Sequence, residues 1–335
     1  MGPPRQRRVT VSLVSALALA VALDLAIVGP SAADPPSREL AARFYPTTTT
    51  SIYEHGTDPS TLYRQGCTAG ATGSSGVVIL DFGRPAERHG TYGTLDFDRR
   101  FVTDRSILTA TERYADGYGD CLPAGSAAHV IIARGTNNSC SNDDPACCPK
   151  RCRFQPRSFF QAGSRWALWT ARLGAHIARR GWTAHERASA ADDAEPAWDP
   201  RFRNTSDFLA GFASRYGYAY PMWDYGSLEP GYWTPDQEWQ VAYGFPPDVP
   251  FPEIYGEGSA REWMALDLWA AEHEGRPMKI WGVASQSVNG FGCGYTPHRA
   301  YDAMLGQLQR EANTFQWSIP FITHIPCPAG TARRR

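Results

Sequence analysis

A short acidic segment in the middle of the chain has the residue types that acid and base catalysis requires. It runs from Ser189 to Asp199 and reads Ser-Ala-Ala-Asp-Asp-Ala-Glu-Pro-Ala-Trp-Asp. If its first half is a strand, side-chain alternation places Asp193 and Glu195 on one face, with Cα atoms about 6.5 Å apart. Two carboxyls at that spacing suit the acid and the nucleophile or base of glycosidic bond cleavage. The segment predicts such a pair, with Glu195 as the acid and Asp193 as its partner.

The position of this pair at the end of a strand also favours a catalytic role. Pro196 cannot donate to a strand ladder, so the strand should end there, where barrel enzymes keep their chemistry. Burial near Trp198 would help Glu195 to hold a proton at neutral pH. The alternative is that the acidic side chains are loop charges that pair with Arg201 or Arg203.

Further polar side chains at expected strand ends complete the candidate site. Asp81 follows the apolar run 77–80 and is the candidate for a carboxylate that binds substrate or activates water. Asp81 and Asp224 could instead serve turns, a common use of Asp. The chain contains none of the common nucleotide-loop, serine-hydrolase or zincin motifs, so we expect no metal and no cofactor. The expected substrate-binding residues are Trp198, Asp224, Tyr225, Asn137, Tyr255 and Gln286.

Apolar runs and helical stripes alternate along the chain in a way that indicates the fold. Alternating strands and helices predict an α/β protein with a parallel (β/α)8 barrel. Four prolines between positions 246 and 252 leave no room for a crossover helix, so we expect distortion around strands five and six. An open doubly wound sheet is the alternative. The expected strands are 77–80, 129–133, 188–193, 219–223, 240–243, 253–255, 279–284 and 317–323, and the expected helices are 107–115, 159–177, 205–216, 259–273 and 296–311.

The start of the chain has the pattern of an export signal. Arg5, Arg7 and Arg8 precede the apolar run 9–28, and small residues follow at 31–33. A membrane anchor is the alternative, but a charge inside the run disfavours it. We expect a secreted or cell-wall-associated protein, exported by the Sec or the twin-arginine route. The expected divisions are a signal peptide (1–33), a polar leader (34–66), a barrel domain (67–327) and a tail (328–335).

Charge and cysteine content narrow the expected partners. The 33 basic and 34 acidic residues give a net charge of -1, which argues against nucleic acid as a partner.

The eight cysteines of an exported chain indicate disulfides, and we expect Cys67 with Cys121 and Cys293 with Cys327. The group at 140–152 would then close its own loop; a zinc knot is the alternative, but the usual CxxC spacing is lacking. We expect a monomer that does not contact the membrane after signal cleavage.

Five short segments also occur in a recognisable order. They are 65–67 (Gln-Gly-Cys), 78–83 (Val-Ile-Leu-Asp-Phe-Gly), 191–198 (Ala-Asp-Asp-Ala-Glu-Pro-Ala-Trp), 224–227 (Asp-Tyr-Gly-Ser) and 252–255 (Pro-Glu-Ile-Tyr). From about Cys67 to Gln286 the chain thus resembles secreted actinobacterial proteins with a glycoside-hydrolase-like barrel domain of unknown function.

The Asp-x-Glu-Pro-x-Trp segment is the most specific part of this resemblance. It is also similar to the acidic pair of the family 25 lysozymes, in which the Glu is the acid. That resemblance implies the acid role for Glu195, with Asp193 as its partner and Asp81 as the first-strand acid. The chain departs from the family in having no clear further catalytic carboxylate on a late strand.

Three functions fit these features. The first is a secreted glycoside hydrolase that cleaves peptidoglycan or another polysaccharide by carboxylate acid and base catalysis. The second is a non-catalytic barrel that binds glycan or cell wall, which the missing late carboxylate favours. The third is a disulfide-rich surface protein without a glycan site at the strand ends.

Overall fold

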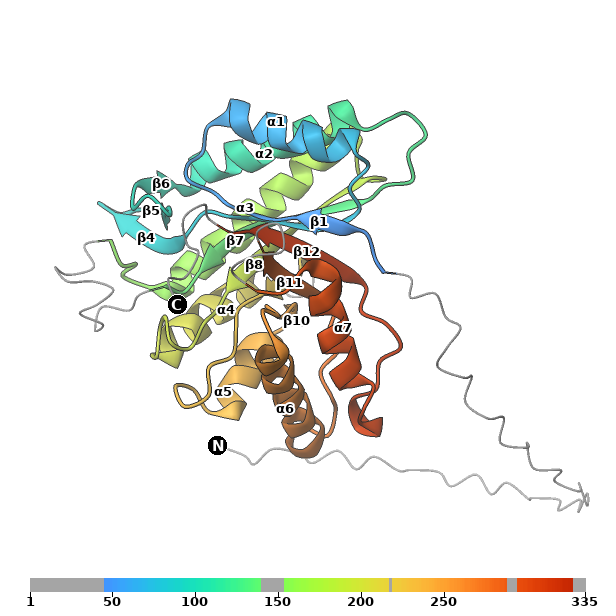
Figure 1. The fold of residues 1–335 in the computed structure, drawn as a ribbon. Coiled ribbons are helices and arrows are strands. Elements are labelled where there is room, and N and C mark those ends of the chain that lie inside the picture. The colour runs from blue at the N-terminus through green and yellow to red at the C-terminus, as the bar shows by residue number, and fades with distance from the viewer. Residues whose placement is uncertain (1–44, 140–153, 217–218, 288–293, 328–335) are drawn as a thin grey trace, which may run out of the picture. The chain divides into compact units, whose positions relative to one another are not determined.

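A ring of parallel strands forms the centre of the molecule (Figure 1). The computed structural model describes residues 45–139, 154–216, 219–287 and 294–327, within a compact unit that begins at Tyr45. One sheet has the strand order β10-β9-β8-β7-β3-β2, and a second has the order β1-β12-β11. The strands are β1 (Thr48–Thr50), β2 (Ile52–Tyr53), β3 (Gly76–Asp81), β7 (Val130–Asn137), β8 (Glu186–Asp193), β9 (Met222–Asp224), β10 (Asp248–Pro250), β11 (Gly282–Ser287) and β12 (Phe321–Pro326).

Two junctions close these sheets into a barrel. At the first junction, β1 pairs with β12. A single residue separates β1 from β2, and β2 pairs with β3. Both pairings are parallel. At the second, a parallel bridge joins Glu253, just beyond β10, to Ala284 of β11. Counting β1 and β2 as one position, eight parallel positions form the ring, which confirms the predicted (β/α)8 fold.

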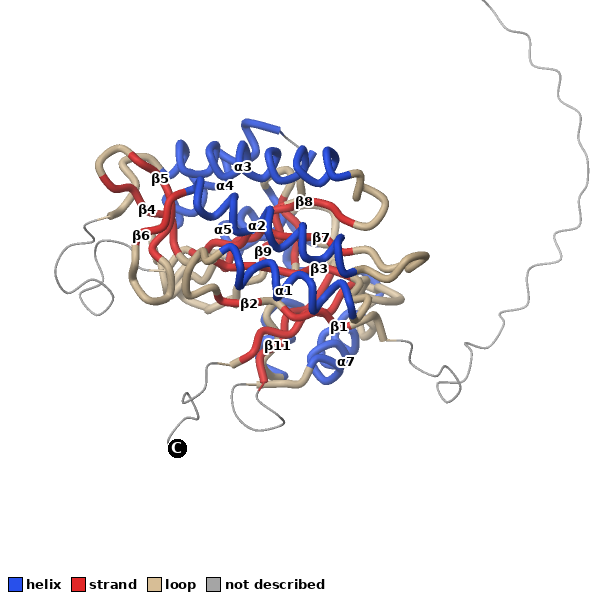
Figure 2. Tube along the Cα trace, turned by 90° about the horizontal axis from the view of Figure 1, so that it is seen from above, coloured by secondary structure: helices blue, strands red, loops and turns tan. Residues whose placement is uncertain are grey.

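The helices lie outside the ring. Figures 1 and 2 place α1, α2 and α3 together over the strands that begin the barrel. A small antiparallel sheet of β4 (Arg84–Arg88), β5 (Thr91–Leu95) and β6 (Phe101–Thr103) follows β3. The helices are α1 (Pro59–Ala71), α2 (Asp104–Cys121), α3 (Phe159–Arg180), α4 (Phe202–Tyr216), α5 (Pro235–Trp239), α6 (Glu257–His273) and α7 (Pro297–Leu308), with a π-helix at Gln240–Gly244 and a 3-10 helix at Ala312–Thr314.

The segment expected to be a polar leader instead contributes to the barrel. Thr48–Thr50 and Ile52–Tyr53 are strands, and the side chain of Thr49 is fully buried. Its hydroxyl contacts Val77 and the hydroxyl of Thr323, so a threonine-rich stretch that reads as low complexity is a buried strand. β-branched and aromatic residues suit such a position. The expected boundary between leader and barrel at Cys67 is therefore corrected.

Three other expected elements are also corrected. Residues 240–243 form a π-helix and not a strand, because Thr234 caps a helix that Pro235 opens and that continues into this segment. Helix α6 begins at Glu257 with Gly256 as its cap, two residues before the expected start at position 259. The strand expected at 253–255 is reduced to the bridge at Glu253, and β10 precedes it. The predicted irregularity around the fifth and sixth strand positions is therefore present.

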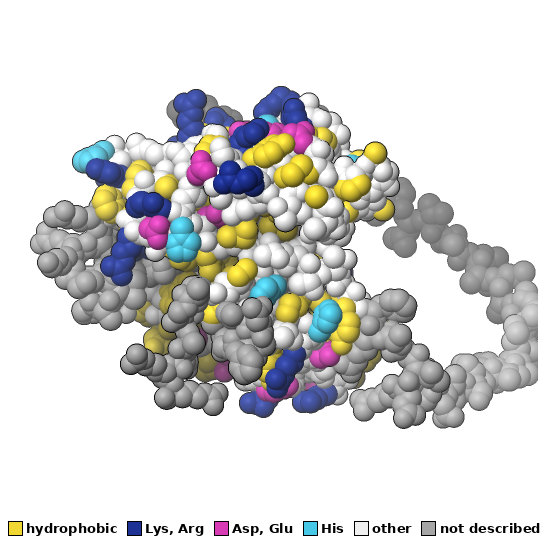
Figure 3. Space-filling view, turned by 45° about the horizontal axis from the view of Figure 1, so that its top comes forward, with side chains coloured by type: hydrophobic (Ala, Val, Ile, Leu, Met, Phe, Trp, Pro, Cys, Tyr) yellow, Lys and Arg dark blue, Asp and Glu magenta, His cyan; other side chains and the backbone are white. Residues whose placement is uncertain are grey.

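Cysteines and termini can be compared with expectation only in part. Cys67 and Cys121 form the expected disulfide, which links α1 to the end of α2. Cys327 is also disulfide-bonded, but its expected partner Cys293 lies outside the described residues, as do the cluster at 140–152, the expected signal peptide (1–33) and the expected tail (328–335). In the described part of the chain, no helix is long and apolar enough to cross a membrane. On the face in Figure 3, basic and acidic side chains are interspersed, as the near-neutral net charge suggests.

Candidate active site

The inner faces of the barrel strands bring several carboxyls together at their C-terminal ends. Val77, Ile79, Ala133 and Ala191 share one buried cluster inside the ring. Because side chains alternate along a strand, Asp81 on β3 and Asp193 on β8 face the same interior. One carboxyl oxygen each from Asp193, Glu195 and Glu253 lies within 4.8 Å of the others. We call Asp193, Glu195 and Glu253 the carboxyl cluster.

Glu195 reaches this cluster from beyond the end of β8. Asn138 holds its backbone, since the Glu195 N–H donates to Asn138 Oδ1 (2.9 Å) and Asn138 Nδ2 donates to the Glu195 carbonyl (3.1 Å). The amide of Asn138 thus continues the pairing of β7 with β8 past the last ladder residue. The predicted pair does lie together, although the strand itself ends at Asp193.

Glu253 lies where the sequence showed no clear catalytic carboxylate, just beyond a late strand. It follows β10, and its N–H donates to the carbonyl of Gly226 (3.3 Å). The inner-facing alternation 249, 251, 253 was present in the sequence, but Pro250 and Pro252 obscured it because prolines weaken a strand prediction. A carboxyl beyond a late strand therefore does face the interior beside Asp193 and Glu195, and its catalytic role stays a proposal.

Burial controls the protonation of these groups. Asp193 is 0% exposed, Glu253 1% and Glu195 8%. Burial raises the pKa of Asp193 and of Glu253 well above the ordinary value, and the charge of neighbouring carboxyls raises both further. Burial raises the pKa of Glu195 to about 7, although the Ser227 hydroxyl, which donates to Oε1 at 3.0 Å, opposes the shift. At neutral pH the carboxyl cluster therefore retains protons.

The alternative in which arginines neutralise the acidic segment does not hold. Arg203 pairs with Asp207, with Nε 3.5 Å from Oδ2. Within the described ranges, no Arg or Lys forms an ion pair with Asp193, Glu195 or Glu253. The cluster is thus an uncompensated group of buried acids, a feature more typical of functional sites than of structural ion pairs.

Among the described residues, tyrosine hydroxyls, and not basic side chains, form hydrogen bonds with two carboxyls of the cluster. Tyr53 donates weakly to Asp193 Oδ2 (3.5 Å) and to Glu253 Oε1 (3.4 Å), and Tyr255 hydrogen-bonds to Glu253. Burial raises the pKa of both tyrosines well above 10, so they remain neutral donors. Tyr53 was missed because it lies in the segment read as a leader.

Asp81 occupies a separate place beside the cluster. Tyr225 donates its hydroxyl to Asp81 Oδ2 at 2.6 Å, and Asn137 Nδ2 lies 3.4 Å from the same oxygen. Burial raises the pKa of Asp81 to about 6, against these two donors and the Gly83 N–H. Asp81 is 1% exposed, and its carboxyl is not one of the three whose oxygens lie within 4.8 Å of one another.

The remaining predicted residues have different positions. Trp198 is half-buried in the loop after β8, and its backbone N–H donates to the Glu195 carbonyl (3.0 Å). Gln286 is half-buried near the end of β11. Asp224 lies on the opposite face of β9 from Trp223 and Tyr225, so the expectation that it faces the site is corrected. The outer face of β9 turns it toward Asp192 and Asp248.

The carboxyl cluster also has the geometry of a possible metal site. In the part of the chain that the structure describes, it is the one group of three acidic or metal-binding side chains whose oxygens are close enough to share an ion. Carboxylate oxygens are ligands that hard divalent cations prefer.

Comparison with known proteins adds little to this geometry. No family model and no curated protein matches the chain. Among solved structures, the chain is similar to an endo-1,4-beta-D-mannanase from Thermotoga petrophila, with 7% sequence identity and a TM-score of 0.42. The match covers 84% of this chain and 88% of that chain. Because a barrel hosts many unrelated activities, the function must be argued from the carboxyl cluster itself.

Proposed function

We propose that the chain is a glycoside hydrolase in which Glu195 is the acid and Glu253 is the carboxylate opposite it. The observation that carries the proposal is the carboxyl cluster, whose three buried members approach within 4.8 Å without a compensating cation among the described residues. Glycosidases use two carboxyls around the scissile bond, one protonated and one ionised.

The environments of the three carboxyls assign their roles. Glu195 is the most exposed, and its pKa of about 7 allows it to donate a proton near neutral pH. Burial raises the pKa of Glu253 well above its ordinary value, and the hydrogen bonds from Tyr255 and Tyr53 oppose that rise, so the two tyrosines favour the ionised form that the proposed role of Glu253 requires. Asp193 is the third member of the cluster, and it orients the reacting group or stabilises the positive charge that develops at the sugar carbon.

The short separation favours retention of configuration. Retaining enzymes hold their carboxyls about 5 to 5.5 Å apart, whereas inverting enzymes need about 6.5 to 9.5 Å to admit a water. The Glu195 proton goes to the leaving oxygen while a Glu253 oxygen bonds to the anomeric carbon. Water then attacks that carbon, its proton returns to Glu195, and Glu253 leaves as carboxylate. Proton NMR of freshly released sugar should show the anomer of the substrate; the opposite anomer would contradict the role of Glu253 as nucleophile.

We further propose a polysaccharide of the cell wall, such as peptidoglycan, as the substrate class, and secretion as the location. The Asp-x-Glu resemblance to the family 25 lysozymes and to the secreted glycoside-hydrolase-like barrels supports the substrate class. The basic and apolar pattern of residues 5–33 supports secretion.

A non-catalytic glycan-binding barrel is the second candidate. The observation that favours it is the burial of Asp193 and Glu253, which leaves little of either carboxyl at the surface. Such a protein would retain glycan without cutting it.

Glycan release separates the two candidates. We would incubate the protein with peptidoglycan and a polysaccharide panel, beside Glu195→Gln and the control Glu238→Gln. Glu238 is another buried glutamate with a raised pKa, but it lies in α5 and outside the carboxyl cluster. Release by wild type and Glu238→Gln, but not by Glu195→Gln, supports the hydrolase. Glycan pull-down without release by any variant would establish the binding barrel instead.

A further inference from the structure

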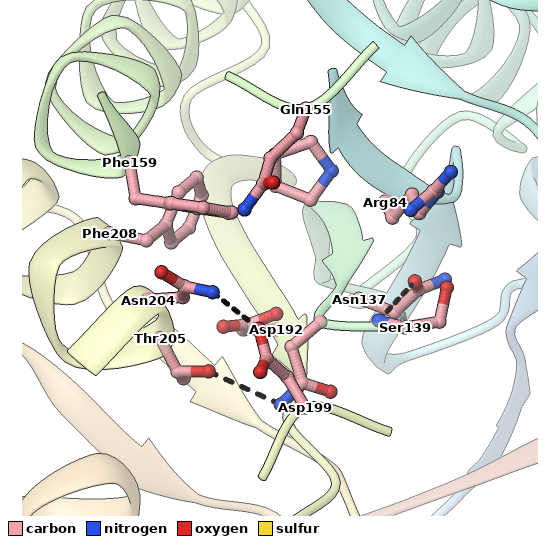
Figure 4. Close-up of a pocket in the computed structure, with 12 residues that line it drawn as sticks. Arg84, Asn137, Ser139, Gln155, Phe159, Asp192, Asp199, Asn204, Thr205 and Phe208 are labelled. Carbon is pink, nitrogen blue, oxygen red and sulfur yellow. Dashed lines mark hydrogen bonds between the residues drawn. The ribbon is translucent and has the colours of Figure 1, made fainter. Parts of the chain in front are cut away.

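A small pocket lies on the outer side of the barrel wall, across β8 from the carboxyl cluster. It is bounded by the ends of β7 and β8 and by helices α3 and α4, and Figure 4 shows its polar lining. Its volume is about 20 Å³, which is room for one water molecule or one ion. The pocket is therefore too small for a sugar.

Asp192 is the most unusual side chain of this pocket. It is 3% exposed and lies on the face of β8 opposite to Asp193. Within the described ranges, its carboxyl accepts no hydrogen bond and forms no ion pair. A buried carboxyl without a partner is costly, so its orientation into a void of ionic size points to a ligand.

A second carboxyl, that of Asp199, lines the same pocket. It is 2% exposed, and its oxygens accept hydrogen bonds from the Arg201 N–H and from Asn204 Nδ2, both at 2.9 Å. Gln155 adds a buried Oε1 for which the described residues supply no hydrogen-bond partner. These three side chains provide oxygen atoms from separate elements around one small space.

The donor atoms of the lining favour a cation. Arg84 is the one basic side chain of the pocket, against the two carboxyls of Asp192 and Asp199. Oxygen is the donor atom throughout, and calcium accepts carboxylate, amide and water oxygens in flexible geometries. We propose that this pocket binds a single oxygen-preferring divalent cation of the calcium type, with Asp192 and Asp199 as its main ligands.

The bound cation would order the loop that carries Glu195. The Asp199 N–H donates to the Glu195 carbonyl at 3.2 Å, so a ligand on Asp199 stabilises the turn between the two residues. This effect on stability does not depend on the proposed hydrolase activity.

Calcium-dependent thermal unfolding and calorimetric titration of the full chain, stripped with EDTA and dialysed, test the proposal. Calcium chloride should raise the unfolding midpoint in a saturable way and titrate with one site, because a ligand that binds only the folded state stabilises it. The shift should be lost in Asp192→Asn and reduced in Asp199→Asn. Circular dichroism confirms that each variant is folded, and sodium chloride at matched ionic strength measures the general salt effect.

Glu253→Gln is the matched control, because the carboxyl cluster is the competing site for a cation. This variant should keep the full calcium response. A response that persists in Asp192→Asn, or that disappears in Glu253→Gln, would overturn the proposal and place the ion in the carboxyl cluster. The absence of any response beyond that of sodium chloride would overturn it as well.

Discussion

The strands β3, β7 and β8 are longer and more regular than β9 and β10, which follow them around the barrel. β3, β7 and β8 have six, eight and eight residues, whereas β9 and β10 have three each and a single bridge joins Glu253 to β11. The regular region provides Asp81 and Asp193, and the irregular region provides Glu253. The comparison indicates that this barrel stays closed through short, irregular strands in the proline-rich region. That region carries Glu253, the proposed second catalytic carboxylate.

Removal of the disulfide should have the largest effect on stability, and it tests how far the regular region depends on its helix pair. The bond joins residues 54 positions apart, for which the chain-entropy model gives about 4 kcal/mol. We expect the double variant Cys67→Ser, Cys121→Ser to unfold at markedly lower denaturant. Unchanged chemical denaturation would show that the α1 and α2 packing alone holds this region.

The stability of the protein should be almost as sensitive to a larger side chain at the close contact between α1 and α2. A Cβ at Gly66 would lie 2.0 Å from the carbonyl oxygen of Tyr114, so we expect Gly66→Ala to cost about 2 to 3 kcal/mol. Gly306 in α7 has open space around a Cβ, so Gly306→Ala should instead stabilise by about 1 kcal/mol. Urea denaturation measures both, and equal effects of the two substitutions would contradict the packing described here.

A smaller effect is expected where the two regions meet. Tyr225, just after β9, donates to Asp81 on β3, and its removal should cost about 1 to 2 kcal/mol. Because this donor lowers the pKa of Asp81, Tyr225→Phe should also raise that pKa further. Infrared titration of the carboxyl band, with Asp81→Asn to assign it, checks the direction of the shift.

The pH dependence of stability should change least. Burial raises the pKa of Glu186 from 4.5 to about 8, so the folded state keeps a proton that the unfolded chain releases above pH 4.5. Its contribution to stability is present below about pH 4.5 and declines as pH rises toward 8. Glu186→Gln should therefore make the unfolding midpoint less dependent on pH in this window. An unchanged slope would show that Glu186 is ionised in the folded protein.

Sequence patterns predicted the regular region better than the irregular one. Continuous apolar runs and helical stripes identified β3, β7, α2 and α3, because burial on both faces of a parallel strand leaves a clear signal. Thr48–Thr50 carried no such signal, since the fully buried Thr49 satisfies its hydroxyl only through partners distant in sequence.

The candidate site divides in the same way. Asp193 and Glu195 could be paired from local spacing, whereas Glu253 joins them only through the long-range bridge to Ala284. Asp224 was expected at the site from its position at a strand end, but side-chain alternation along β9 puts it on the face opposite to Trp223 and Tyr225. Spacing along one segment is a local property, but convergence between strands depends on the closed ring.

The most direct test of the central claim is the rate of glycan release by Glu253→Gln, measured beside wild type on the substrate that the panel identifies. If Glu253 is the second catalytic carboxylate, a folded Glu253→Gln protein should lose about 10³-fold or more in rate, comparable to Glu195→Gln. Wild-type release by Glu253→Gln would contradict the account, because Asp193 and Glu195 would then suffice without the late-strand carboxylate.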